Sequence, residues 1–271
     1  MFSRKVVVVG AVIIVLIIIV AAFAPWLAPY DPYETNLKEA LDTPSKAHLL
    51  GTDALGRDTL SRIIYGSRTS LLVGIVSIFI AATLGLLLGL IAGYYGGVAN
   101  NIIMRLIDCL MAFPMILLAL VIASVLGGGL NNVMIAIGIG LTSVYARLMC
   151  GQVLSIREND YILAGKSLGS SNIRTMFWHI LPNTFPSMIV LLTLQLGGLI
   201  LAEAGLSFLG VGITPPTPAW GAMVADGRRY LLEYPWLSLS PGLAIMLVVF
   251  AFNLVGDGLR DALDPRLRGI L

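Results

Sequence analysis

The chain offers few residues for chemistry, and the most suggestive group is Gly165-Lys166-Ser167. Gly-Lys-Ser ends the loop in which backbone N–H groups and a lysine hold nucleotide phosphates. That loop also needs a glycine five positions before Gly165, where this chain has Asp160, and no strand precedes the segment. No other Gly-Lys-Ser or Gly-Lys-Thr occurs in the sequence. The sequence therefore predicts no nucleotide site in this polypeptide.

The histidines and cysteines form no pattern of a metal or catalytic site. His48 and His179 are the only histidines, and they lie far apart in the sequence. Cys109 and Cys150 lie in or at the end of apolar stretches, which is typical of small packing residues. The His-Glu-x-x-His and Gly-x-Ser-x-Gly motifs are absent. We therefore expect no catalytic residue, no metal and no cofactor in this chain, which argues against a membrane enzyme.

A polar stretch at 157–183 interrupts an otherwise apolar sequence. Asp160 is placed to cap a helix that begins at Tyr161, because its carboxylate can accept the free N–H groups of the first turn. Gly169 permits a sharp reversal of the backbone after this helix. The sequence thus predicts two short helices joined at Gly169.

The second short helix is predicted to expose apolar side chains. Turn or cap residues precede it: Ser170, Ser171 and Asn172. Four apolar residues then recur at helical spacing and predict one apolar face: Ile173, Met176, Phe177 and Ile180. Pro182 is expected to stop this helix and start the next apolar stretch. Such a helix fits a groove in a partner protein, and the alternative is a helix lying on lipid.

The elements that carry these residues belong to a membrane protein. Hydrophobic residues make up 58% of the chain and charged residues 12%, against about 45–50% and about 25% in soluble domains. A length of 271 residues leaves room for about six spans of roughly 20 residues. We expect an all-α membrane protein with six transmembrane helices in a lipid bilayer. The net charge of +2 is too small to indicate a nucleic-acid partner.

Six apolar stretches mark the expected spans: 6–24, 69–94, 102–126, 131–150, 184–203 and 240–256. The first could be a signal peptide, but its apolar core exceeds the roughly 7–15 residues of that class. Pro25, Trp26 and Tyr30 follow it like an interfacial anchor. We therefore interpret it as a retained helix.

Positive charges set the expected orientation. Arg4 and Lys5 place the N-terminus in the cytoplasm by the positive-inside rule. Alternation then puts three segments outside: 27–68, 127–130 and 204–239. It puts three segments inside: 95–101, 151–183 and the tail from Asp257. Both termini are thus expected to be cytoplasmic, and so is the polar stretch.

The glycines and the charged residues within the expected spans each allow two interpretations. Gly85, Gly89 and Gly93 form a ridge of small residues that lets helices approach closely; static packing is favoured over a role in a moving bundle. Arg105 and Asp108 lie one helical turn apart, and we expect them to pair on one helix face. Charges in spans are often functional, which is the alternative. Glu203 is expected either in a translocation cavity or at the interface.

The polar stretch resembles the coupling loop of ABC importer permeases. The letters Y-I-L-A-G-K-S-L-G and then H-I-L-P-N carry the resemblance. Around Lys166, the family pattern falls on Leu163, Ala164, Gly165, Gly169, Ile180 and Pro182. In this family the loop docks into a cleft of an ATPase subunit. Leu163 replaces the family's Glu, so docking is expected to depend on shape and apolar contact around Ala164, Gly165 and Gly169.

Further stretches narrow the resemblance to the second permease of dipeptide, oligopeptide and nickel importers. They are H-L-L-G-T-D-A-L-G-R-D (48–58) with the following S-R-I-I-Y-G-S-R-T-S-L, G-L-S-F-L-G-V-G (205–212), P-A-W-G-A-M-V-A-D-G-R-R-Y (218–230) and A-F-N-L-V-G-D-G-L-R-D-A-L-D-P-R (251–266). The resemblance implies the ABC importer permease fold. Its expected parts are an N-terminal helix (1–26), an outer loop (27–68), a permease core (69–260) and a cytoplasmic tail (261–271).

The resemblance also implies partners and a location. A homologous second permease would form a heterodimer with this chain, and two ATPase subunits would bind ATP and Mg. An extracytoplasmic binding protein would deliver dipeptides or oligopeptides, with nickel as the alternative cargo. The complex would lie in a bacterial or archaeal cytoplasmic membrane. A secondary transporter, as a different class, usually has more buried charge than this chain.

Charged and aromatic residues of the outer segments could contact the binding protein or the substrate, Arg62, Arg229 and Tyr230 among them. Six candidates are singled out: Asp53, Arg57, Asp58, Trp220, Asp226 and Arg228. For each of them, a salt bridge or turn within the loop is the alternative. Asp and Thr beside Gly in the 51–58 stretch indicate a folded, capped loop.

Overall fold

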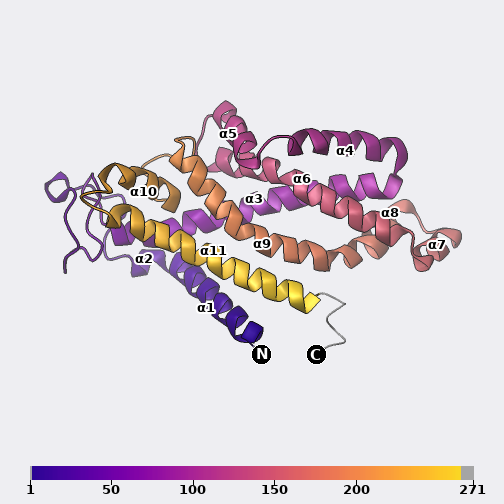
Figure 1. Cartoon of the computed structure of the whole chain (residues 1–271), viewed down its shortest axis with the longest axis horizontal. Coiled ribbons are helices and arrows are strands. Elements are labelled where there is room, and N and C mark those ends of the chain that lie inside the picture. Colours follow the sequence, from indigo (N-terminus) through magenta and orange to yellow (C-terminus); the bar gives the residue numbers. More distant parts are fainter. Residues whose placement is uncertain (1, 264–271) are drawn as a thin grey trace.

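A computed structural model describes residues 2–263, which form helices joined by loops, with no strand among them (Figure 1). In chain order the elements are α1 (Phe2–Ala22), α2 (Ala24–Leu27), η1 (Leu37–Glu39), α3 (Thr59–Tyr95), α4 (Gly97–Met111), α5 (Met115–Leu126), α6 (Leu130–Arg157), α7 (Asp160–Ser167), α8 (Asn172–Arg174), η2 (Thr175–Ile180), α9 (Leu181–Phe208), α10 (Trp220–Gly227), η3 (Arg228–Tyr230) and α11 (Trp236–Leu263). Most of the expected tail, at 264–271, lies outside the described residues.

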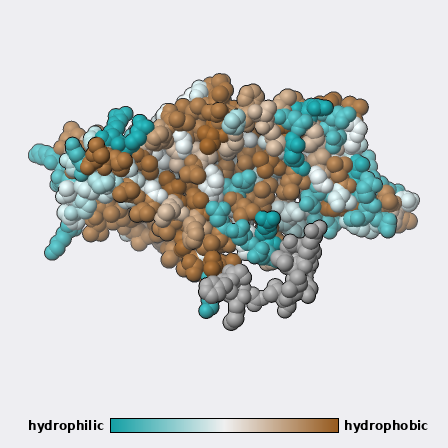
Figure 2. Space-filling view, in the orientation of Figure 1, coloured by the Kyte–Doolittle hydropathy of each residue, from teal (hydrophilic) through white to brown (hydrophobic). Residues whose placement is uncertain are grey.

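The expected membrane spans are present as long apolar helices. Five runs are long and apolar enough to cross a membrane: α1, α3, α6, the run Asn172–Phe208, and α11. The pair α4 and α5 together would make a sixth. Figure 2 shows hydrophobic side chains over the middle of the visible face and hydrophilic ones gathered toward both ends. The chain is therefore a multi-pass membrane protein with the expected helical class.

The predicted span 102–126 is broken into two helices. Helices α4 and α5 meet at an angle of 92°. The break contains Pro114, which has no N–H to continue a helix and disfavours helical backbone at the preceding Phe113. Pro114 itself adopts ψ 129°, outside the helical region. The proline thus ends one helix and redirects the next.

The most extensive helix–helix interface joins α3 and α6, and it includes the predicted glycine ridge. A Cβ built on Gly93 would lie 2.7 Å from Cβ of Val153, and one on Gly89 would lie 2.6 Å from Cβ of Met149. A Cβ on Gly85 would likewise overlap α6. The two helix backbones therefore approach more closely than any larger residue permits.

The charged residues within the spans have other partners than predicted. Asp108 forms its ion pair with Arg147 of α6, so the expected pair with Arg105 is wrong. The reason is geometric: the Asp108 carboxylate meets the neighbouring helix rather than the residue one turn before it. Glu203 of α9 is fully buried and accepts a hydrogen bond from Ser207 Oγ at 2.7 Å, so it does not mark an exposed interface.

The loops gather at two opposite ends of the bundle (Figure 1). At one end, Arg62 Nη1 donates to Pro216 O at 3.3 Å, and Gly129 N–H donates to Gly212 O at 3.2 Å. The segments predicted to lie outside therefore meet one another. Helices α7 and α8 lie at the other end. The grouping agrees with the alternation expected from the sequence.

Candidate functional site

The polar stretch reverses at Gly169, between the short helix α7 and the helical run that begins with α8. This residue has φ +83°, a backbone region that glycine adopts readily. Ser171 Oγ accepts a hydrogen bond from the backbone N–H of Arg174 at 3.3 Å and caps α8. The predicted reversal and the predicted cap residue are thus confirmed.

The start of α7 differs from the prediction. The helix begins at Asp160, and Asn159 occupies the cap position without a side-chain hydrogen bond. Asn159 has extended backbone, with φ −70° and ψ 142°, which fits a cap position. Asp160 therefore lies in the first turn, where its negative charge still complements the helix dipole.

Pro182 does not stop the second helix, as was predicted. The chain continues from α8 through the π-helical turn η2 into α9. In this turn the Leu181 N–H donates to Met176 O, one residue further back than in an α-helix. Pro182 then falls in the first turn of α9, where its missing N–H is tolerated. The wide turn lets the helix pass the proline.

The predicted apolar face of this helix is divided. Met176 and Ile180 are buried against α3, α6 and α7, whereas the side chains of Ile173 and Phe177 are 68% and 42% exposed. Residues four apart lie on the same line of a helix, so Met176 and Ile180 form the side that packs on the bundle and Ile173 and Phe177 form the side beside it. Only part of the predicted face therefore reaches water.

Exposed apolar side chains nevertheless cluster at this end of the molecule. We call the following residues the coupling surface: Tyr161, Leu163, Leu168, Ile173, Phe177 and Trp178. Leu168 is 90% exposed and Trp178 77%. Beside them lies a hollow of about 550 Å³ lined by Ser171, Ile173, Arg174, Trp178 and His179. Two residues of the coupling surface, Ile173 and Trp178, line this hollow. Exposed apolar side chains that lie together are typical of a protein-binding surface.

The other coupling-loop candidates lie around this surface, with one exception. Ala164, Lys166, Gly169 and Pro182 are exposed. A Cβ built on Gly165 would meet no atom within 4 Å. The exception is Ile180, which is fully buried and anchors the segment.

Tyr94 and Asn172 fasten the coupling surface to the end of α3. The Tyr94 hydroxyl donates to Asn172 Oδ1 at 2.8 Å, and Lys166 Nζ lies 4.9 Å from the centroid of the Tyr94 ring. Arg157 Nη1 donates to Gly93 O at 2.9 Å. Sequence reasoning named Asn172 only as a turn or cap residue and missed Tyr94, because nothing in the sequence links positions so far apart. The end of α3 therefore contacts α8 through Asn172 and α7 through Lys166.

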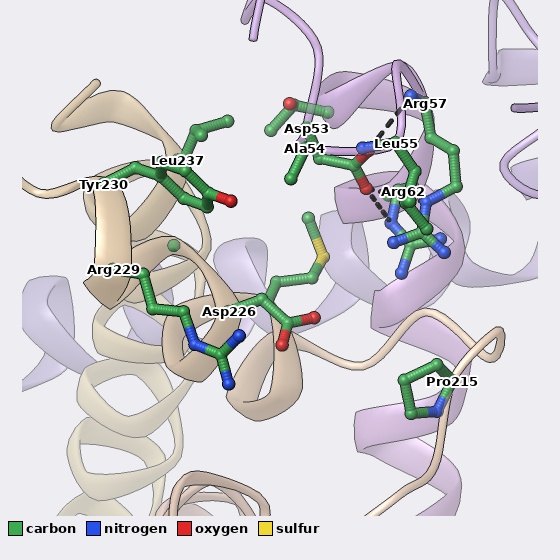
Figure 3. Close-up of a pocket in the computed structure, with 13 residues that line it drawn as sticks. Asp53, Ala54, Leu55, Arg57, Arg62, Pro215, Asp226, Arg229, Tyr230 and Leu237 are labelled. Atoms are coloured by element: carbon green, nitrogen blue, oxygen red, sulfur yellow. Dashed lines mark hydrogen bonds and ion pairs between the residues drawn. The ribbon is translucent and has the colours of Figure 1, made fainter. Parts of the chain in front are cut away.

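The opposite end of the molecule contains a pocket of about 250 Å³ (Figure 3). Its walls come from the outer loop, the start of α3, and the segment from α10 to the start of α11. The lining residues are Asp53, Ala54, Leu55, Arg57, Thr59, Arg62, Pro215, Met223, Asp226, Gly227, Arg229, Tyr230 and Leu237. Three of the six singled-out outer candidates thus meet here: Asp53, Arg57 and Asp226.

Asp53 organises one side of the pocket. Its Oδ2 atom lies 2.7 Å from Arg57 Nε and 3.5 Å from Arg62 Nε, as Figure 3 shows with dashed lines. Its Oδ1 atom accepts the backbone N–H groups of Leu55 and Arg57 at 2.9 and 3.0 Å. Arg62 also donates to Pro32 O at 2.9 Å. This side is therefore a preformed network with one surplus positive charge.

Asp226 and Arg229 lie on the other side of the pocket. Partial burial raises the pKa of the Asp226 carboxyl, and the Arg57 and Arg62 guanidiniums oppose that shift. Within residues 2–263, neither Asp226 nor Arg229 has an ion-pair partner within 4.0 Å. Arg62 and Arg229 also line the pocket, and both belong to the wider set of outer residues that the sequence indicated.

The remaining outer candidates lie elsewhere. Asp58 is buried, contacts His48 Nδ1 at 2.9 Å and caps α3 by accepting the Ser61 N–H at 2.7 Å. Trp220 is 2% exposed and donates to Ile63 O at 2.9 Å. The two side chains hold the fold together and do not reach the surface, because each is enclosed by the elements it joins. The Arg228 guanidinium lies 4.5 Å from the centroid of the Phe208 ring, outside the pocket.

Comparisons with known proteins agree with this arrangement. The family described as binding-protein-dependent transport system inner membrane component matches residues 85–269. The N-terminal transmembrane domain of oligopeptide transport permease C matches residues 1–44. A crystal form of the inward-facing MetNI methionine ABC transporter aligns with a TM-score of 0.60 at 18% identity, over 75% of this chain and 96% of that one. The last match shows a shared fold.

Curated relatives match nearly the whole chain. The dipeptide transport system permease protein DppC of Alkalihalophilus pseudofirmus is 47% identical over 97% of this chain and 87% of its own length. The glutathione transport system permease protein GsiD of Pectobacterium atrosepticum is 45% identical over 98% of this chain and 89% of its own length. With the helical architecture and the family match, these likenesses show that the chain belongs to the binding-protein-dependent transport system inner membrane components, the permeases of ABC importers.

Proposed function

We propose that this chain is one half of the translocation pathway of an ATP-driven importer for dipeptides or oligopeptides. The observation that carries the proposal is the coupling surface, an apolar patch fastened to α3 by Tyr94 in a chain of this family. The printed names of two relatives, a dipeptide permease and a di/tripeptide permease, support peptides as the cargo.

The proposed complex has four kinds of subunit. A homologous permease pairs with this chain, and two ATPase subunits bind ATP and Mg and hydrolyse the ATP. An extracytoplasmic binding protein delivers the peptide at the end that holds the outer loop. This assignment places the coupling surface and both termini in the cytoplasm. The broken phosphate-loop pattern at Asp160 supports a chain without its own nucleotide site.

The residues of this chain would convert ATPase movement into helix movement. The ATPase engages the coupling surface, with Leu163 making apolar contact where the family has Glu. The pair Tyr94–Asn172 passes the displacement to α3, and the glycine ridge passes it to α6. Such coupling requires that the ATP-bound state of the ATPase favours one arrangement of the spans over the other.

Transport and binding measurements test the proposal. The complete complex in lipid vesicles should take up a radiolabelled dipeptide only with its binding protein and ATP. Calorimetry of the binding protein against a dipeptide panel and Ni²⁺ should show peptide binding. Tight Ni²⁺ binding without peptide binding would overturn the peptide assignment. Uptake that needs no ATPase would instead indicate a secondary transporter.

A further inference from the structure

The outer pocket has no role in the coupling just described. It lies at the end of the bundle opposite α7 and α8 (Figure 1). Its volume of about 250 Å³ corresponds to about eight water molecules at roughly 30 Å³ each. This space suits one or two small amino-acid residues.

The pocket combines two charges of opposite sign that remain open to a ligand. Asp226 and Arg229 are exposed and have no ion-pair partner within 4.0 Å in the part of the chain that the structure describes. Both project from the α10–η3 segment, as Figure 3 shows. Asp53, in contrast, is already occupied by Arg57 and Arg62. The charges available to a ligand are therefore the Asp226 carboxylate and the Arg229 guanidinium. The positive side of the pocket, formed by Arg57 and Arg62, lies beside them.

Apolar side chains complete the pocket. Leu55, Pro215, Met223 and Leu237 line it together with the ring of Tyr230. Met223 and Leu237 are buried, so they form a fixed apolar surface. A few placed polar groups on an apolar lining are typical of a small-molecule site. A ligand that fits has one cationic end, one anionic end and a small apolar body.

We propose that this pocket binds a short zwitterionic peptide on the outer face of the permease. The ammonium group of the peptide pairs with Asp226. Its terminal carboxylate pairs with Arg229 and faces the positive side chains of Arg57 and Arg62. A side chain of the peptide packs on Met223 and Leu237. The proposal deepens the proposed function, on which it rests. Paired charged side chains on the binding protein would offer the same chemistry, and the experiment separates the two sources.

Equilibrium binding to the permease–ATPase complex, without binding protein, tests the site. The probe is L-alanyl-L-alanine, with N-acetyl-L-alanyl-L-alanine as the ligand that lacks the cation. Asp226→Asn and Arg229→Gln should each weaken binding of the free dipeptide about tenfold or more, because each removes a charge-assisted contact. Acetylation should weaken wild-type binding similarly, and Asp226→Asn should add little further loss for the acetylated peptide. Glu233→Gln, an exposed carboxylate outside the pocket, is the matched control and should bind like wild type.

The outcomes separate this site from the transport function. Equal affinity for the free and acetylated dipeptides, or no effect of either pocket variant, overturns the site. The site is also overturned if a pocket variant leaves dipeptide binding unchanged and weakens only the affinity of the binding protein for the complex. The pocket would then hold the binding protein. If the complex takes up peptide with ATP while the pocket binds none, the site proposal fails and the transport proposal stands. If no peptide is transported at all, the transport proposal itself fails.

Discussion

Single residues set the shape of the coupling surface. Gly169 reverses the backbone at φ +83°, a conformation in which a side chain strains the chain. Tyr94 contributes a hydroxyl to Asn172 and a ring to Lys166 from a distant helix. The sequence predicted the glycine, because turn chemistry is local. It could not predict the tyrosine, because that contact depends on how α3 and the polar stretch are packed.

Gly169→Val should uncouple ATP hydrolysis from transport. A β-branched residue disfavours positive φ, so the reversal between α7 and α8 should shift. We expect a several-fold fall in peptide transported per ATP hydrolysed, measured in vesicles containing the whole complex. Gly151→Val is the control, since Gly151 lies in α6 with open space and no positive φ. An unchanged transport ratio in the Gly169 variant would contradict the proposed role of the reversal.

Tyr94→Phe separates the hydroxyl from the ring. The variant keeps the aromatic face beneath Lys166 and loses the hydrogen bond to Asn172, which contributes about 0.5–1.5 kcal/mol. Tyr94→Ala loses both contacts. We expect the transport ratio to fall slightly in the first variant and strongly in the second. Equal ratios in both variants and wild type, with normal assembly, would show that this link transmits nothing.

At the scale of elements, proline and glycine explain most differences between expectation and structure. The type and order of the helices followed from apolar length and charge. Pro114 bends a predicted span by 92°, whereas Pro182 is passed by a π turn. The sequence does not distinguish the two prolines. Whether a helix ends or continues at a proline depends on which neighbours can stabilise a wide turn. The apolar face predicted for this helix is divided because the bundle covers Met176 and Ile180 and leaves Ile173 and Phe177 exposed.

Gly89→Ala should loosen the contact between α3 and α6. The added methyl would overlap Ala146 O and lie 2.6 Å from Met149 Cβ, and overpacking costs about 1–3 kcal/mol. We expect a lower melting temperature of the purified complex in detergent. Gly205→Ala, in α9 with nothing within 4 Å, should melt like wild type. Similar melting of both variants would show that the helix contact yields without cost.

The whole molecule is divided between two ends with different chemistry. The inner end presents apolar side chains around short helices, and the outer end presents a charged pocket. The composition predicted the membrane class, and the spacing of motifs predicted the inner end. The charged pocket residues Asp53, Arg57, Arg62, Asp226 and Arg229 were all among the outer residues that the sequence indicated, but the sequence did not show that they share one pocket. The sequence did not distinguish Asp58 and Trp220 from surface residues, because their burial depends on how the loops pack in the folded protein.

Leu168→Ser should weaken attachment of the ATPase subunits. Leu168 is 90% exposed on the coupling surface. Replacing its side chain with serine removes apolar area that would be buried against the proposed partner. We expect less ATPase to co-purify with the tagged permease. Leu232→Ser is matched in chemistry but lies at the outer end, where Leu232 is 100% exposed. Equal recovery of ATPase from both variants would place the docking contact elsewhere.

The bend between α4 and α5 has a consequence for the chain in a bilayer. Residues 112–114 are exposed at the break, where the backbone leaves the helix. Hydrocarbon cannot hydrogen-bond free N–H and C=O groups, so an irregular backbone at membrane depth needs protein or water beside it. Because the break falls within the predicted span 102–126, we expect the exposed face around Phe113 to be covered by protein or water in the assembled transporter.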